Sequence, residues 1–199
     1  ENLSANNNIA VLLPYFNLAV ILLLLLFAIP LYIKKDWSFT QSWYCGIVYI
    51  YFPLIVGVYF LQQNFEVNRW IALGLVIINW CNDSFAYFTG RIFGRTPLAP
   101  SISPKKTIEG ALGGIAFGIL AAYLLNLYLF EVSYPIEKII VLGFTVCIAG
   151  ISGDLYESKM KRLAGIKDSG TLLPGHGGFL DRFDSFFYII PIGIFVISI

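Results

Sequence analysis

The feature that most constrains this chain is the recurrence of apolar runs long enough to cross a lipid bilayer. Each run is near the roughly 20 residues that an α-helix needs to span about 30 Å of hydrocarbon. Charged residues make up only 13% of the 199 residues, whereas a soluble domain has about 25%. The sequence therefore predicts a single, all-α integral membrane domain over residues 1–199, a polytopic transmembrane bundle of about six spans. These spans are expected at about residues 9–33, 43–61, 70–90, 109–130, 137–157 and 182–199.

The basic residues are sorted by position along the chain. Only Arg69 and Lys138 fall outside three loops that follow the first, third and fifth predicted spans. Those loops, with their edges, hold Lys34, Lys35, Arg91, Arg95, Lys105, Lys106, Lys159, Lys161, Arg162, Lys167 and Arg182. The positive-inside rule places these loops in the cytoplasm and both termini outside. We expect a multi-pass protein of the cell (inner) membrane. No basic tail or stripe suggests a nucleic-acid partner.

The third predicted span contains a carboxylate. Asp83 lies about two turns before Arg91, in the run INWCNDSFAYFTG. A charged side chain at the centre of a span costs about 2.5–3.5 kcal/mol, and less toward an end. One interpretation is a polar contact between helices, helped by Asn79 and Asn82. The other is a charge that faces a water-filled cavity near the cytoplasmic surface.

The next loop, GRIFGRTPLAPSISPKKTIEG, has a composition that suits a polyphosphate. Arg95, Lys105 and Lys106 would neutralise negative charge, and the glycines let the backbone approach a ligand closely. Thr107 followed by Glu109 resembles a helix start, which would add a site for anions. The alternative is an ordinary basic cytoplasmic loop.

Two segments each carry a pair of carboxylates. Asp154 and Glu157 are three residues apart, as are Asp181 and Asp184, and Ser158 shares the face of the first pair. Four carboxylates at one membrane surface would repel one another unless cations lay between them. Hard oxygen ligands without clustered Cys or His suit Mg²⁺. The alternative is that each carboxylate pairs with a nearby cation, namely Lys159, Arg162 or Arg182.

The glycine-rich loop LAGIKDSGTLLPGHGG lies between these two segments. Lys167 and His176 could reach phosphate oxygens from this loop. A single histidine in a chain more often has a structural role than a functional one. Because glycines flank His176, we give a structural role and a phosphate-binding role equal weight.

The stretch SKMKRLAGIKDSGTLLPGHGGFLDRFD, residues 158–184, is similar to the signature of the phosphatidate cytidylyltransferases, also called CDP-diacylglycerol synthases. The stretch NDSFAYFTG running into APSISPKKTIEG resembles the same family, as does GDLYES just before the signature. Together these segments cover roughly residues 79–190. Residues 1–70 carry no motif of the family, whose members are usually longer at the N-terminus.

The resemblance implies the reaction CTP + phosphatidate → CDP-diacylglycerol + pyrophosphate. It also implies Mg²⁺ near Asp154 and Asp181, with a second cation such as K⁺ as an option, and leaves a homodimer open. Catalytic roles would fall to Asp154, Asp181, Lys167, Asp168, Arg182 and His176. Contacts to the nucleotide would come from Lys105, Lys106, Ser103, Arg95, Asp83, Lys161 and Arg162. The metal ligands would be drawn from Asp154, Asp181, Asp184 and Glu157.

Two other functions compete with this interpretation. A CTP-dependent lipid kinase of the polyprenol type would transfer the γ-phosphate and make no CDP-lipid. A transporter or channel with a cation site would explain the carboxylates in the third and fifth spans. It would not explain the Gly-Lys-His loop or the segment PSISPKKT.

Overall fold

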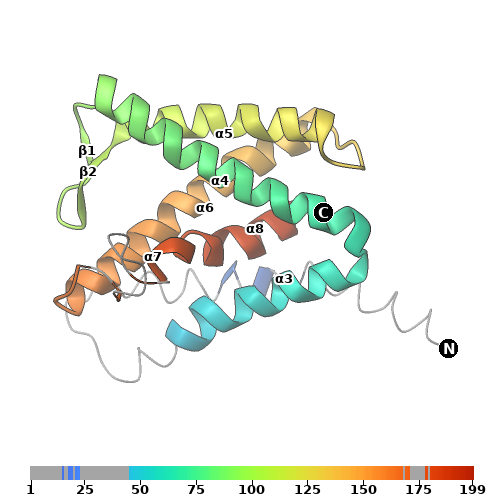
Figure 1. Ribbon diagram of the computed structural model, residues 1–199, viewed down its shortest axis with the longest axis horizontal. Helices are drawn as coiled ribbons and strands as arrows, with labels where there is room; N and C mark the ends of the chain where they lie inside the picture. Colours follow the sequence, from blue (N-terminus) through green and yellow to red (C-terminus); the bar gives the residue numbers. More distant parts are fainter. Residues whose placement is uncertain are drawn as a thin grey trace.

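The computed structural model describes residues 45–167, 169, 170, 178 and 180–199, with the isolated helical positions 15, 18, 19, 21 and 22. The predicted span 9–33 lies almost entirely outside the described residues. The elements are a π-helix η1 (Cys45–Tyr51), α3 (Phe52–Gln63), α4 (Phe65–Phe93), β1 (Pro97–Ala99), β2 (Ser103–Thr107), α5 (Ile108–Tyr128), α6 (Ile136–Leu163), α7 (Leu180–Phe183) and α8 (Phe186–Ser198). Figure 1 shows their arrangement.

Three helices are long and apolar enough to cross a membrane, and all three were predicted. Helices α4, α5 and α6 have 29, 21 and 28 residues, and they contain most of the predicted spans 70–90, 109–130 and 137–157. Helices α4 and α6 overrun those predictions because their polar end turns remain helical beyond the apolar run. The chain is therefore a mainly helical protein of membrane-spanning character.

The other two predicted spans within the described residues are shorter helices. The apolar helical stretch Val48–Gln63 falls below the length of a spanning helix. The segment predicted at 182–199 is interrupted between α7 and α8, and α8 has 13 residues with Pro191 inside it. The count of about six spans stays a prediction.

Helix α5 packs through a stripe of small residues. Its buried positions recur every four residues, at Gly110, Gly114, Gly118, Ala122 and Asn126. A Cβ atom at Gly114 would lie 2.6 Å from the backbone oxygen of Asn82 in α4, so the two backbones are in close contact. Small residues allow such approach between membrane helices. Large apolar side chains such as Leu112 and Leu127 are exposed, as expected of a surface in contact with lipid.

Helix α6 forms the centre of the molecule. Ile139, Leu142 and Val146 are fully buried in it, together with Ile78 of α4 and Ile189 of α8. Figure 1 shows α6 crossing between the α4–α5 pair and the α8–α3 pair. The polar end of α6 is therefore held in place by packing against the other helices.

A two-stranded antiparallel hairpin departs from the all-α prediction. Strands β1 and β2 pair with Pro97 opposite Thr107 and Ala99 opposite Ser103. The hairpin is fixed to α5, because Thr107 Oγ1 accepts a hydrogen bond from the Gly110 N–H at 3.1 Å. The hairpin could not be predicted from the sequence, since strands of three and five residues that contain proline show no alternation of apolar side chains.

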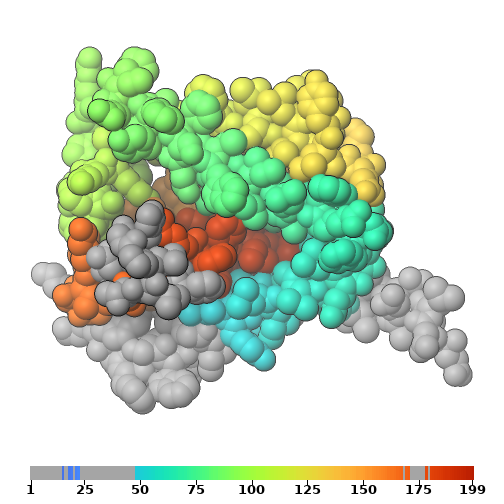
Figure 2. Space-filling view, in the orientation of Figure 1, coloured from blue at the N-terminus to red at the C-terminus, as the bar shows by residue number. Residues whose placement is uncertain are grey.

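The polar segments gather at one end of the bundle. Figure 1 shows the hairpin, the last turns of α6 and α7 on the same side of the molecule. In the space-filling view of Figure 2 the hairpin and the end of α6 stand at one edge. This arrangement sets the candidate functional residues apart from the opposite ends of the helices.

Candidate active site

One group of charged side chains joins the hairpin to α6. The ammonium group of Lys106 on β2 forms an ion pair with the carboxylate of Asp154 on α6. Ser158, one turn later, donates its hydroxyl hydrogen to Asp154 Oδ1 at 3.2 Å. Consecutive residues of a strand point to opposite sides, so Lys105 is exposed. The ion pair therefore fixes the position of the hairpin relative to α6.

Two further carboxylates belong to this group. Asp83 accepts hydrogen bonds from the side-chain amides of Asn79, at 3.2 Å, and Asn82, at 3.5 Å. It also interacts electrostatically with Lys106, Asp154 and Asp184. Asp83 is an exposed residue, and both interpretations, a polar contact between helices and a charge that faces a water-filled cavity, stay open. We call the group formed by Asp83, Lys106, Asp154 and Asp184 the Lys106 cluster.

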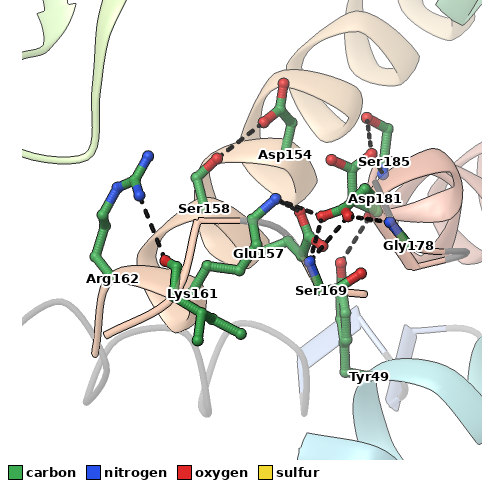
Figure 3. A network of polar contacts seen from close by, with 12 residues as sticks. Tyr49, Asp154, Glu157, Ser158, Lys161, Arg162, Ser169, Gly178, Asp181 and Ser185 are labelled. Carbon is green, nitrogen blue, oxygen red and sulfur yellow. Dashed lines mark hydrogen bonds and ion pairs between the residues drawn. The ribbon is translucent and has the colours of Figure 1, made fainter. Parts of the chain in front are cut away.

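A second group lies around Lys161. The Lys161 Nζ atom is 2.7 Å from Glu157 Oε2 and 2.7 Å from Asp181 Oδ1, as Figure 3 shows. All three side chains are largely buried, with exposed fractions of 15% for Lys161, 1% for Glu157 and 10% for Asp181. Glu157 and Lys161 are four residues apart with the acid first, which is the favourable order on a helix. We call these three residues the Lys161 cluster.

Asp181 is held by backbone groups as well. The N–H groups of Ser169 and Gly178 donate to Asp181 Oδ2 at 2.9 and 2.7 Å. Burial of the Asp181 carboxyl would raise its pKa, but the Lys161 ammonium and the two N–H groups outweigh burial and hold the pKa well below its usual range. Asp181 is therefore ionised at neutral pH. A carboxyl group with a depressed pKa adds stability above its ordinary pKa, and that stability is lost as the pH falls below it.

Tyr49 contributes to the site from a segment without any family motif. Its hydroxyl donates a hydrogen bond to the backbone oxygen of Asp184 at 2.7 Å. A Cβ atom at Gly153 would lie 2.8 Å from that same oxygen. The turn that carries Asp184 is thus enclosed between η1 and α6.

The Tyr49 ring packs against the rings of Tyr156, Phe187 and Tyr188, at 5.0–5.8 Å between centroids. The sequence offered no sign of this role, because Tyr49 lies in an apolar run 135 residues from its partner.

A pocket of about 220 Å³ adjoins the Lys161 cluster. Its polar lining comes from Glu157, Lys161 and Ser169, and its apolar lining includes Met160, Ile166 and Leu180. The side-chain oxygens of Glu157 and Ser169 are buried, and both side chains interact with the Asp181 carboxylate. The pocket therefore combines apolar walls with polar side chains of the Lys161 cluster and its neighbour Ser169.

Most of the remaining predicted site residues that the structure describes lie at the surface. Arg95, Lys105, Arg162, Lys167 and Arg182 are exposed, and Ser103 is partly buried on β2. Arg162 donates a hydrogen bond to the backbone oxygen of Ile166 at 3.4 Å. Asp168 and His176 lie outside the described residues.

The predicted set of four carboxylates pairs with two lysines, and Asp184 interacts electrostatically with Asp154 of one cluster and Glu157 of the other. Asp154 and Asp184 belong to the Lys106 cluster, and Glu157 and Asp181 to the Lys161 cluster. The cations that pair with Asp154, Glu157 and Asp181 are Lys106 and Lys161, not Lys159 or Arg162 as the alternative predicted. Lysine ammonium groups thus provide part of the positive charge that we expected from a metal ion.

The described residues do not form a complete metal cage. Within this part of the chain, no three His, Cys, Asp or Glu side chains converge on one ion-binding position. Mg²⁺ commonly uses only one or two carboxylates, with waters and substrate phosphates as its other ligands. Asp154 and Asp184 provide hard oxygen donors of this kind in one cluster. The donor set therefore fits an Mg²⁺ ion shared with a phosphate substrate.

Comparisons with known proteins find relatives that share one name. The chain is 36% identical over 183 residues to the phosphatidate cytidylyltransferase of Aquifex aeolicus (strain VF5), covering 92% of the chain and 68% of that protein. It is 34% identical over 184 residues to the phosphatidate cytidylyltransferase of Bacillus subtilis (strain 168), with the same coverage. The identity to the Staphylococcus epidermidis (strain ATCC 12228 / FDA PCI 1200) protein of that name is 38% over 159 residues, covering 80% of the chain and 60% of the relative.

The chain thus spans between 60% and 68% of the length of these relatives. A model described as the cytidylyltransferase family matches residues 3–199, which is nearly the whole chain. The match includes both clusters and the hairpin that carries Lys106. The chain belongs to the cytidylyltransferase family.

Proposed function

We propose that this chain transfers the cytidylyl group of CTP to phosphatidate, giving CDP-diacylglycerol and pyrophosphate. The observation that carries the proposal is the meeting of the family-like segments at one end of the bundle. Lys106 and Asp154 come from segments 48 residues apart, and Lys161 and Asp181 from segments 20 residues apart. The names of the relatives give the substrates of those proteins as CTP and phosphatidate.

The reaction makes modest demands on protein side chains. A phosphate oxygen of phosphatidate forms a bond to the α-phosphorus of CTP, and the bond from that phosphorus to the oxygen bridging the β-phosphate breaks. Pyrophosphate leaves with that oxygen. Phosphoryl-type transfer depends on positioning and on charge neutralisation rather than on covalent help from the protein. Lys106 supplies a fixed positive charge beside Asp154, and exposed Lys105 and Arg95 lie on or next to the same hairpin.

Asp154 and Asp184 are the described residues that would hold Mg²⁺, and Asp181 and Glu157 stay predicted ligands. When bound, the ion would neutralise charge on the phosphates. Lys106 orients Asp154 through the ion pair, and Ser158 fixes the second carboxylate oxygen of Asp154. A second cation such as K⁺ stays part of the proposal.

We further propose that the site faces the cytoplasm from the inner membrane, in a chain of about six spans. The distribution of basic residues supports this orientation, because the hairpin and the end of α6 hold five of the basic residues of the predicted cytoplasmic loops and lie at one end of the bundle. CTP is a water-soluble substrate of the cytoplasm, so a site there has direct access to it.

Two labels distinguish this activity from a lipid kinase. Purified protein in liposomes that contain phosphatidate receives CTP labelled on either the α- or the γ-phosphate. We expect the α-label to enter the lipid fraction and the γ-label to appear in pyrophosphate. Entry of the γ-label into lipid, with none of the α-label, would show a kinase and reject the proposal.

A further inference from the structure

Helix α4 buries two asparagine side chains next to Asp83. Asn79 is 2% exposed and Asn82 is completely buried. The side-chain carbonyl oxygens of both residues have no hydrogen-bond partner among the described residues. Buried polar atoms are nearly always hydrogen-bonded in folded proteins, so each exception calls for an explanation. An apolar side chain would avoid this cost, so the explanation must lie in what the N–H groups of the two amides do.

The amide N–H groups of both asparagines serve Asp83. Asn79 Nδ2 donates to Asp83 Oδ2 at 3.2 Å, one turn further along the same helix. Asn82 Nδ2 donates more weakly to the other carboxylate oxygen, Asp83 Oδ1, at 3.5 Å. An ionised carboxylate only accepts hydrogen bonds, so an amide beside it must present its N–H groups and turn its carbonyl oxygen away. Both of these bonds stay within α4, so neither of them joins α4 to another helix.

A glycine of α6 leaves room for the Asn79 carbonyl oxygen. A Cβ atom at Gly150 would overlap Asn79 Oδ1 and would lie 3.4 Å from Asn79 Cγ. With the carbonyl oxygen placed against α6, the N–H groups of Asn79 face Asp83. Figure 1 shows α4 and α6 crossing. Asn79 and Gly150 each precede by four residues a carboxylate of the Lys106 cluster, Asp83 and Asp154. The contact between the helices therefore lies one helical turn from both carboxylates.

We infer that Asn79 is a positioning residue of the active site, an inference that rests on the proposed cytidylyl transfer. Its amide holds the Asp83 carboxylate in one orientation relative to Lys106 and Asp154. Asp83 is an exposed residue that interacts electrostatically with both. The χ2 angle of an aspartate is broadly distributed unless a partner fixes it. The buried amide of Asn79 is such a partner.

The first test replaces Asn79 by alanine. In Asn79→Ala we expect kcat for transfer of the α-label from CTP to lipid to fall by about tenfold or more, because hydrogen-bond partners that orient reactive side chains contribute roughly 10- to 100-fold. The matched control is Asn126→Ala, which removes a buried amide of α5 that binds the backbone N–H and C=O of Tyr134, at 3.0 and 3.1 Å. The control should lose stability and keep kcat within about twofold. A kcat within about twofold of the wild type in Asn79→Ala would overturn the inference.

A second variant separates positioning from packing. Gly150→Ala displaces the Asn79 amide without changing Asn79 or Asp83, so it should lower both the unfolding temperature and kcat. Adding Asn79→Ala to Gly150→Ala makes room for the new methyl group and should restore the unfolding temperature, with kcat still about tenfold or more below that of the wild type. If Asn79 served packing alone, the double variant would regain turnover together with stability. That recovery would overturn the inference.

A third variant tests whether Asn79 acts through Asp83. Asp83→Asn should lower kcat at least as much as Asn79→Ala does, since a positioning residue cannot contribute more than the group that it positions. A smaller loss in Asp83→Asn would overturn the inference and leave the proposed function standing. Failure of the wild type to form CDP-lipid would instead reject the proposed function.

Discussion

At the scale of single residues, Lys161 has the clearest energetic role. It contacts the buried carboxylates of Glu157 and Asp181 at 2.7 Å each. The Glu157–Lys161 pair could be predicted from the sequence, because an acid four residues before a lysine is a known helix pattern. The pairing of Lys106 with Asp154 could not be predicted, since 48 residues separate them. Only the folding of the hairpin against α6 brings those two side chains together.

Removing Lys161 should destabilise the protein strongly. Lys161→Ala leaves two buried carboxylates without their shared cation, and breaking a buried ion pair in this way costs about 3 kcal/mol or more. Thermal unfolding of the detergent-solubilised protein measures the effect. The exposed Lys105→Ala variant is the control, and its effect should stay within about 0.5 kcal/mol. Equal unfolding temperatures for the two variants would contradict the role given to Lys161.

At the scale of elements, the sequence predicted the three long helices and missed the contacts between short elements. Apolar runs in the sequence located α4, α5 and α6, because a helix surrounded by lipid or by other helices needs apolar side chains along its length. Asp154 and Glu157 were expected to act together as neighbours on one helix face. The structure pairs them with different lysines. Lys106 on β2 contacts Asp154. Lys161 contacts Glu157 and also Asp181 on α7. Such tertiary contacts leave no periodic pattern in a sequence.

The Tyr49 hydroxyl should help to position the turn between α7 and α8. Tyr49→Phe removes only the hydrogen bond to the Asp184 backbone oxygen and keeps the aromatic packing. We expect a loss of stability of about 1 kcal/mol and a fall in kcat with little change in the KM for CTP. Steady-state kinetics in liposomes provides the measurement, with the exposed Tyr51→Phe as control. An unchanged kcat in Tyr49→Phe would show that the turn is positioned by packing alone.

At the scale of the whole molecule, polar groups are collected at one end of an apolar bundle. The clustering of basic residues in alternate loops predicted this arrangement, and the hairpin and the α6 terminus lie together as expected. The number of spans could not be fixed in the same way. Within the described residues, a short helix such as α8 is as apolar as a spanning one but has only 13 residues.

The proposed orientation predicts which end of the bundle reacts with a thiol reagent that cannot cross membranes. In a parent with Cys45, Cys81 and Cys147 replaced by Ala, Lys105→Cys on the hairpin should react only in inside-out vesicles. Val132→Cys, an exposed position between α5 and α6, should react only in intact cells. Labelling of both positions from one side would contradict the predicted topology.

The most direct test of the central claim measures transfer of the α-label from CTP to lipid by Asp154→Asn and Asp181→Asn. Each substitution keeps the size of the side chain and removes the charge that Lys106 or Lys161 contacts. We expect a loss of about 100-fold or more in each variant, in protein that still elutes as a folded species from detergent. Turnover near that of the wild type in either variant would show that the two clusters are not the active site.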